Sequence, residues 1–250
     1  MNKLNFFLVT YDRLYDKVIE NLNETEISDI VCYNVQKSVL KKITPLVKNQ
    51  INEWELEWND FGYQKKQYYE YAAFIHLLKN PKLVENLTHI GISHYDTIME
   101  KNSIKNLYKD LEKNPNIIFY QRIRDTYDLY LSKYEVDCLS NFMSEKLEMN
   151  IDPNNIWNNG WISEALSLTP KSVFMKFAEF LLNNKSEIEN ILLQNKWGIM
   201  NHINHRICGV VERMWGFYLV SCGLTLKKMD IIHDWDSYVH KHTTEPNWIK

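Results

Sequence analysis

The chain has 250 residues, of which 45% are hydrophobic and 24% are charged. These proportions are typical of a globular protein and exclude an intrinsically disordered chain. The net charge is −3 and the lysines are scattered among Asp and Glu, so there is no basic stripe and nucleic acid is not an expected partner.

The four cysteines stand far apart and form no C-x-x-C pair. This spacing argues against a zinc ribbon and a disulfide framework and indicates reduced thiols. The first apolar run, Phe6-Phe7-Leu8-Val9, is too short for the core of a signal peptide. No stretch approaches the about 18 apolar residues of a membrane span. We therefore expect a cytoplasmic protein with no membrane span.

Apolar spacing and β-branched runs predict an alternation of strands and helices. The expected strands are 4–10, 27–35, 90–92, 116–120, 165–168 and 224–232. The expected helices are 14–22, 64–80, 104–111, 125–149 in two pieces, and 210–222, which Gly223 ends. Two more helices are expected from their first residues. One has Thr169 as its cap and Pro170 at its first position, and the other has the spacing of a capping box at Ser186. Segments 50–63 and 152–160 have the composition of loops. The opening order strand, helix, strand predicts a parallel sheet, and the absence of repeats or linkers predicts one domain over 1–250.

The stretch from Thr88 to Met99 has the most informative pattern in the chain. Gly91 inside the apolar strand suggests that another backbone or a ligand passes close to it. His94 and Asp96 follow at the carboxyl end of this strand, where ligands bind in open α/β sheets. An imidazole and a carboxylate together suit Mn²⁺ or a similar divalent cation. The alternative is a polar turn in which Asp96 bonds to the backbone.

Glu212 stands near the start of a helix that is otherwise apolar. A carboxylate in the first turn gains about 0.3–1 kcal/mol from the helix dipole, which is sufficient as a structural explanation. The functional alternative is a general base beside the strand ends. Phosphate-binding glycine loops are absent, which excludes P-loop proteins and dinucleotide-dependent dehydrogenases. His202, His205 and the histidines near the carboxyl terminus suit solvated turns better than a metal site.

Several blocks in a fixed order resemble small glycosyltransferases with the A-type (GT-A) nucleotide-diphosphosugar fold, of the kind found in bacterial polysaccharide loci and large DNA viruses. The blocks are E-W-E-L-E-W-N-D from Glu53, the helix from Tyr69-Glu70 to Asn80, I-G-I-S-H-Y-D from Ile90, L-S-L-T-P-K-S-V-F from Leu166 and C-G-V-V-E-R-M-W from Cys208. The resemblance implies an α/β fold with a mixed, mostly parallel sheet between helices. It also implies a nucleotide-sugar-binding part over about 1–120 and an acceptor part over about 121–250.

The resemblance further implies a UDP- or GDP-sugar donor, a glycan acceptor, and transfer of a hexosyl or pentosyl group. A divalent metal, Mn²⁺ or Mg²⁺, would be held by Asp96, with His94 standing where the family usually has the first carboxylate of D-x-D. Glu212 would be the general base.

Three further residues, Thr10, Tyr11 and Tyr33, follow or end the first two strands, where a nucleotide would bind. The resemblance alone places Gln64 and Tyr68 near the donor.

Two other functions compete with the transferase. A carbohydrate- or nucleotide-binding protein without turnover would also suit the incomplete D-x-D motif and the eight Trp residues. A metal phosphohydrolase would use His94, Asp96 and the carboxyl-terminal histidines, but it needs more clustered ligands than the sequence supplies.

Overall fold

The computed structural model describes residues 2–10, 18, 29–35, 49–60, 62–65, 68–95, 97–125, 131–163, 166–195 and 207–233. Of the helix expected over 14–22, Val18 alone lies within these ranges. His202 and His205 lie outside them.

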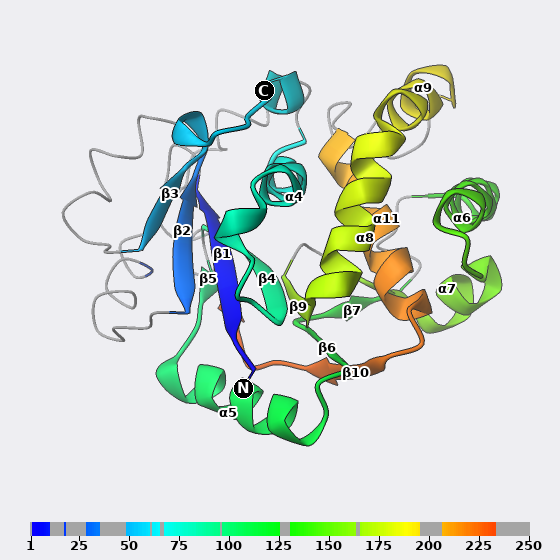
Figure 1. The fold of residues 1–250 in the computed structure, drawn as a ribbon. Helices are drawn as coiled ribbons and strands as arrows, with labels where there is room; N and C mark the ends of the chain where they lie inside the picture. Colours follow the sequence, from blue (N-terminus) through cyan, green and yellow to red (C-terminus); the bar gives the residue numbers. More distant parts are fainter. Residues whose placement is uncertain are drawn as a thin grey trace, which may run out of the picture.

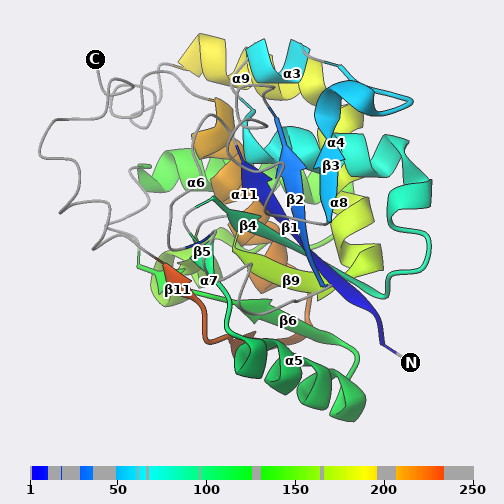
Figure 2. The same cartoon turned by 90° about the vertical axis from the view of Figure 1, so that its left-hand side faces the viewer.

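A seven-stranded sheet in the order β10-β6-β9-β4-β1-β2-β3 forms the centre of the fold. The strands of the chain are β1 (Leu4–Thr10), β2 (Ile30–Asn34), β3 (Gln50–Asn52), β4 (His89–His94), β5 (Thr97–Ile98), β6 (Ile117–Tyr120), β7 (Ile123–Arg124), β8 (Trp161–Ile162), β9 (Ser167–Pro170), β10 (Thr225–Lys228) and β11 (Ile232–His233). Neighbours in the large sheet are parallel except β9, which is antiparallel to both β4 and β6 (Figure 2). The predicted mixed, mostly parallel sheet is confirmed.

Helices cover both faces of this sheet. They are η2 (Glu53–Glu55), α3 (Gly62–Lys65), α4 (Glu70–Lys79), η3 (Pro81–Leu83), α5 (Lys101–Lys113), α6 (Lys133–Leu147), α7 (Pro153–Asn159), α8 (Lys171–Asn183), α9 (Lys185–Asn195) and α11 (Ile207–Ser221). Figure 1 shows α4, α8 and α11 on one side of the sheet and α5 on the other. No helix among the described residues is long and apolar enough to cross a membrane.

Alternation along the strands produces two separate cores. On β1, Phe7 and Val9 face the side of α4, α8 and α11, whereas Phe6 and Leu8 face α5. The first core is rich in aromatic rings, and the Phe74 ring on α4 stacks on an α8 ring with centroids 4.3 Å apart. Both cores therefore depend on the same central strands.

Two expected loops contain regular structure. Segment 152–160 is the helix α7, because its turn-forming residues act as helix ends: Asp152 accepts from the Asn154 N–H at 2.9 Å, Pro153 opens the helix, and Gly160 closes it. Segment 50–63 begins with β3, which pairs with β2. A short strand of polar residues has no apolar alternation, so periodicity could not find it.

The helix expected over 64–80 is two helices, α3 and α4. Tyr69 between them has a φ of 50°, which is incompatible with a continuous right-handed helix. The predicted stop at Asn80-Pro81 is confirmed, since Asn80 caps α4 and its side-chain amide donates to the His76 carbonyl at 2.7 Å.

Two expected helix caps are wrong. Thr169 is buried inside β9, and Pro170 rather than Thr169 is the cap of α8. Ser186 lies inside α9, which starts at Lys185, so it forms no capping box there. The expected strand over 224–232 is also two strands, because β10 pairs with β6 and β11 pairs with β5.

β4 extends further than the apolar run predicted, since it includes Ser93 and His94. The nearest neighbour of Gly91 is a side chain, because a Cβ added at Gly91 would collide with the Phe6 ring. This glycine allows β1 and β4 to pack with an aromatic ring lying across them.

Candidate functional site

The carboxyl ends of β1, β2 and β3 meet at one edge of the sheet, where three polar side chains lie in register. Thr10 is opposite Asn34, and Asn34 is opposite Asn52. Thr10 Oγ1 donates to Asn34 Oδ1 at 2.7 Å, and Asn34 Nδ2 donates to Asn52 Oδ1 at 2.9 Å. Because these side chains hydrogen-bond to one another, their positions are fixed. They lie at the edge where open α/β sheets bind ligands.

Tyr33 belongs to a buried cluster on the α4 side of the same edge. Its hydroxyl lies 3.0 Å from His76 Nδ1, and Glu53 Oε1 lies 2.9 Å from the same nitrogen. His76 Nε2 accepts from the Asp60 N–H at 3.2 Å, so the neutral ring carries its proton on Nδ1. Burial, and then the Glu53 charge, raise the pKa of the Tyr33 hydroxyl well above its usual value. Through Glu53 and Asp60, these contacts hold the segment 50–63 against α4.

A second polar group surrounds the carboxyl end of β4. His94 Nε2 lies 3.6 Å from Glu70 Oε1, and about one-fifth of each side chain is exposed. Glu70 opens α4 directly after Tyr69. The left-handed backbone of Tyr69 is uncommon for a bulky residue, and such conformations cluster at functional sites. The turn into α4 therefore directs Glu70 toward the strand end.

An ion pair from α11 lies on the same face of the sheet. Arg213 Nη1 donates to Glu212 Oε2 at 2.6 Å and to the Gly209 carbonyl at 2.9 Å. The guanidinium carbon stands 4.8 Å from the centroid of the Trp161 ring, which adds a cation–π contact. The Arg213 side chain is 5% exposed and that of Glu212 is 22% exposed. The carboxylate thus reaches the surface while a buried cation fixes its orientation.

Gly216 explains how α11 comes so close to β8. A Cβ at Gly216 would collide with the Ile162 carbonyl oxygen and would lie 2.7 Å from Trp161 Cε3. α11 starts at Ile207 and has no acidic residue in its first turn, so the expectation that Glu212 lies in that turn is wrong. The helix dipole acts mainly within the first turn, so the Arg213 contact is the stronger local reason for the position of the Glu212 carboxylate.

Tyr71 connects the Glu70–His94 pair with the Glu212–Arg213 pair. Its side chain is fully buried. Burial, and then the charges of Glu212 and Glu70, raise the pKa of its hydroxyl well above the usual value. Both carboxylates therefore act on the same phenol group, at the contact between α4 and α11.

The remaining predicted residues are placed as follows. Tyr11 and Asp96 lie outside the described residues, and Gln64 lies in α3 with its side chain outside the description. Tyr68 is buried, and its hydroxyl donates to Glu189 Oε1 at 3.4 Å. Their roles toward a donor stay predictions, as do those of Thr10 and Tyr33.

Asn34, Glu70 and Tyr71 are among the residues of the site that the sequence patterns did not indicate. Asn34 carried a usable signal, because it is the polar residue that ends the second apolar strand. Glu70 and Tyr71 carried none, since both fell inside an apparently continuous helix. They open a separate helix, α4, after the break at Tyr69, which the sequence does not mark.

The described residues contain no group of three His, Cys, Asp or Glu side chains that could hold a metal ion. His94 and Glu70 offer an imidazole and a carboxylate 3.6 Å apart. That pair of ligand types suits Mn²⁺ and similar cations, so the residues present fit part of such a site.

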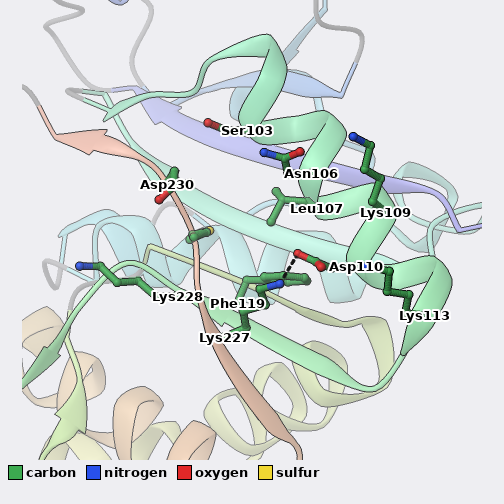
Figure 3. Close-up of a pocket in the computed structure, with 11 residues that line it drawn as sticks. Ser103, Asn106, Leu107, Lys109, Asp110, Lys113, Phe119, Lys227, Lys228 and Asp230 are labelled. Atoms are coloured by element: carbon green, nitrogen blue, oxygen red, sulfur yellow. Dashed lines mark ion pairs between the residues drawn. The ribbon is translucent and has the colours of Figure 1, made fainter.

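A hollow of about 310 Å³ lies on the other face of the sheet, between α5 and β10 (Figure 3). Leu107 and Phe119 contribute to its apolar lining, and Lys227 Nζ lies 2.7 Å from Asp110 Oδ2. Figure 3 shows Lys109 and Lys228 extending away from each other. Because these charges do not converge, we place the candidate site at the carboxyl edge of the sheet.

Comparison with known proteins identifies the fold. No protein-family model and no curated protein matches the chain. Among solved structures, it is similar to the bifunctional glycosyltransferase WbbM in its apo form, with a TM-score of 0.59 and 12% identity over 92% of this chain. The chain has a GT-A-like glycosyltransferase fold.

The chain spans less than half the length of WbbM, because the similarity covers 45% of that protein. Core-mannan synthase A of Aspergillus fumigatus, in an Mn/GDP form, overlaps with a TM-score of 0.44 and 11% identity, covering 92% of this chain and 75% of that protein. An overlap that loose supports no inference about ligands. In an open α/β sheet of this kind, ligands bind at the carboxyl ends of the strands, which is where the candidate site lies.

Proposed function

We propose that the protein is a glycosyltransferase that moves a sugar from a nucleotide-diphosphate sugar to a hydroxyl of a glycan acceptor. The observation that supports the proposal is the Glu212–Arg213 pair at 2.6 Å on α11, a helix that packs against α4 in a chain with a GT-A-like fold. A general base needs a carboxylate that is partly exposed and has a fixed orientation, as Glu212 has.

In this proposal Glu212 accepts the proton of the acceptor hydroxyl as the hydroxyl oxygen attacks the anomeric carbon. The nucleoside diphosphate leaves as its bond to that carbon breaks. Arg213 keeps the Glu212 carboxylate aimed at the acceptor through its 2.6 Å hydrogen bond. General-base catalysis of this kind contributes about 10²–10⁴-fold.

The donor would lie along the edge formed by the first two strands, near Thr10, Tyr11 and Tyr33, with Gln64 and Tyr68 nearby. Asp96 and His94 would hold Mn²⁺ or Mg²⁺, and Glu70, 3.6 Å from His94, is a further candidate ligand. A divalent cation bound there supplies positive charge to the diphosphate.

A thermal-shift panel tests the proposal. The full chain is measured with UDP- and GDP-sugars and the free nucleotides, each with and without Mn²⁺. A ligand at a hundred times its dissociation constant stabilises by about 2.7 kcal/mol, which raises Tm by about 5–10 °C for a chain of this size. We expect one sugar nucleotide to stabilise the protein in a metal-dependent way, and we expect Asp96→Asn to abolish the metal dependence while the ligand-free Tm is preserved.

Release of the nucleoside diphosphate in the presence of a glycan acceptor then separates an enzyme from a binding protein. Stabilisation without any release would favour the carbohydrate- or nucleotide-binding alternative. An unchanged Mn²⁺ response in a folded Asp96→Asn protein would remove Asp96 from the metal site.

A further inference from the structure

The Tyr71 hydroxyl is a buried polar group that makes no hydrogen bond to any residue that the structure describes. Its side chain is fully buried at the start of α4, and its ring packs against Phe74 with centroids 5.4 Å apart. The hydroxyl has no hydrogen-bond partner among the residues that the structure describes. Buried tyrosine hydroxyls normally have one, since an unmade bond costs free energy. A partner supplied by a ligand would explain why the group is kept.

A second unpartnered donor flanks the same ion pair. The Trp161 indole N–H is buried and has no partner within the described part of the chain. The Trp161 ring lies 4.8 Å from the Arg213 guanidinium, which bonds to Glu212 at 2.6 Å. Tyr71 lies on the side of α4 that packs against α11, because its ring contacts Phe74, whose ring lies 5.0 Å from that of Trp215 on α11. Two buried donors, neither with a partner among the described residues, therefore lie in the part of the fold where α4 and Trp161 meet the helix that carries one carboxylate–guanidinium pair.

The chemistry of these groups defines what they bind. An indole N–H only donates, and the O–H of a phenol donates one hydrogen bond. Their missing partners are therefore oxygen acceptors. A sugar offers several hydroxyl oxygens at the spacing of neighbouring ring positions, and each hydroxyl can accept one hydrogen bond while donating another. One hydroxyl can thus donate to Glu212 while its neighbour accepts from Tyr71.

We propose that Tyr71, with Trp161, forms the binding site for the acceptor sugar, in which Tyr71 donates a hydrogen bond to a ring hydroxyl adjacent to the one that Glu212 deprotonates. This inference rests on the proposed function and names the residues that recognise its acceptor. Tyr71 is then a specificity-determining residue, because an acceptor lacking that neighbouring hydroxyl leaves the phenol unpaired again.

Tyr71→Phe tests the inference, and Tyr218→Phe is the matched control. Tyr218 is a buried tyrosine on α11 whose hydroxyl is satisfied, since it donates to the Val173 carbonyl at 3.2 Å. Removal of a bonded hydroxyl lowers Tm, whereas removal of an unpaired one leaves Tm equal or higher. We therefore expect Tyr218→Phe to melt earlier than the wild type and Tyr71→Phe not to. A loss of Tm in Tyr71→Phe equal to that in Tyr218→Phe would overturn the inference, because the hydroxyl would then have a partner without ligand.

The acceptor is probed with p-nitrophenyl glycosides of mannose, galactose and glucose, both for binding and for transfer. We expect the acceptor KM to rise about tenfold in Tyr71→Phe, the equivalent of one lost hydrogen bond of about 1.4 kcal/mol, and to stay at the wild-type value in Tyr218→Phe. An unchanged acceptor KM in Tyr71→Phe would overturn the inference and leave the transferase proposal intact. Glycosides that stabilise the wild type but not Tyr71→Phe, with no transfer by either protein, would support the sugar site and overturn the transferase.

Discussion

Glu212 is the residue on which the proposed chemistry depends, and its neighbour sets what a substitution does. Glu212→Gln keeps the size of the side chain and an oxygen that can accept from Arg213 at a similar distance. It removes the carboxylate that would take up a proton. We expect transfer to fall by on the order of 10²-fold or more, with the donor-induced Tm shift preserved, as measured by diphosphate release and melting curves.

Glu187→Gln is the control for this substitution. Glu187 also makes an ion pair, 3.0 Å from Lys146, but it lies on the exposed surface of α9. The Glu187→Gln substitution should leave the rate of transfer unchanged. A wild-type rate in a folded Glu212→Gln protein would end the base assignment. A joint loss of folding and binding would mean that the pair with the buried Arg213 is structural, because the change leaves that cation without its counter-charge.

At the scale of elements, the contact between β1 and β4 depends on the absence of one side chain. A Cβ at Gly91 would lie 2.6 Å from Phe6 Cε1. We expect Gly91→Ala to destabilise the protein by about 1–3 kcal/mol, the usual cost of overpacking, in urea unfolding. In a Phe6→Leu background the same change should cost less, because the ring that it meets is gone. An equal cost in both backgrounds would mean that the ring is not the obstacle.

The elements also divide into those that sequence patterns could find and those that they could not. Long apolar runs such as 4–10 were found with the correct bounds, because burial on both faces requires an unbroken apolar strand. Segment 152–160 was misread, because Asp, Pro and Gly serve equally as turn residues and as helix ends. The Tyr69 break could not be found, since no glycine or proline marks it. The sequence shows which residues can form a turn or end a helix, but tertiary packing decides which of the two they form.

The same division applies to the candidate site. His94 and Glu212 were predicted as site residues because each interrupts an apolar pattern, and their roles stay predictions. Tyr71 falls inside the helix expected over 64–80, and its ring belongs to the core on that side of the sheet. Both Glu70 and Glu212 raise the pKa of its hydroxyl only because α4 and α11 approach from distant parts of the sequence, and no local pattern encodes this approach.

At the scale of the whole molecule, His89 should make stability depend on pH. His89 is buried at the start of β4, and its Nε2 lies 2.9 Å from the Pro115 carbonyl. Burial lowers the pKa of the ring below its ordinary value of 6.5, and the bond to Pro115 offsets part of this effect. Near and below pH 6.5 the unfolded chain therefore binds a proton that the folded chain does not, so the stability from this group is present above that pH and is lost as the pH falls.

We expect Tm to decrease between pH 7.5 and pH 5.5, and to decrease less in His89→Gln, whose amide can still donate to the Pro115 carbonyl. Melting curves at the two pH values in both proteins measure the difference. Parallel decreases in the two proteins would show that other groups cause the pH dependence.

The antiparallel strand β9 sets the order in which the molecule can be completed. It lies between β4 and β6, although both precede it in the chain, and β10 beyond β6 comes later still. On the ribosome, β4 and β6 therefore emerge with an open gap between them, and at about 5–20 residues per second the gap stays open for several seconds. Until β9 (Ser167–Pro170) has been synthesised, the edges of β4 and β6 that pair with it stay exposed. The nascent chain should then be most prone to pair with a neighbouring copy of itself, and ribosome pausing just after Pro170 is exposed should relieve this tendency.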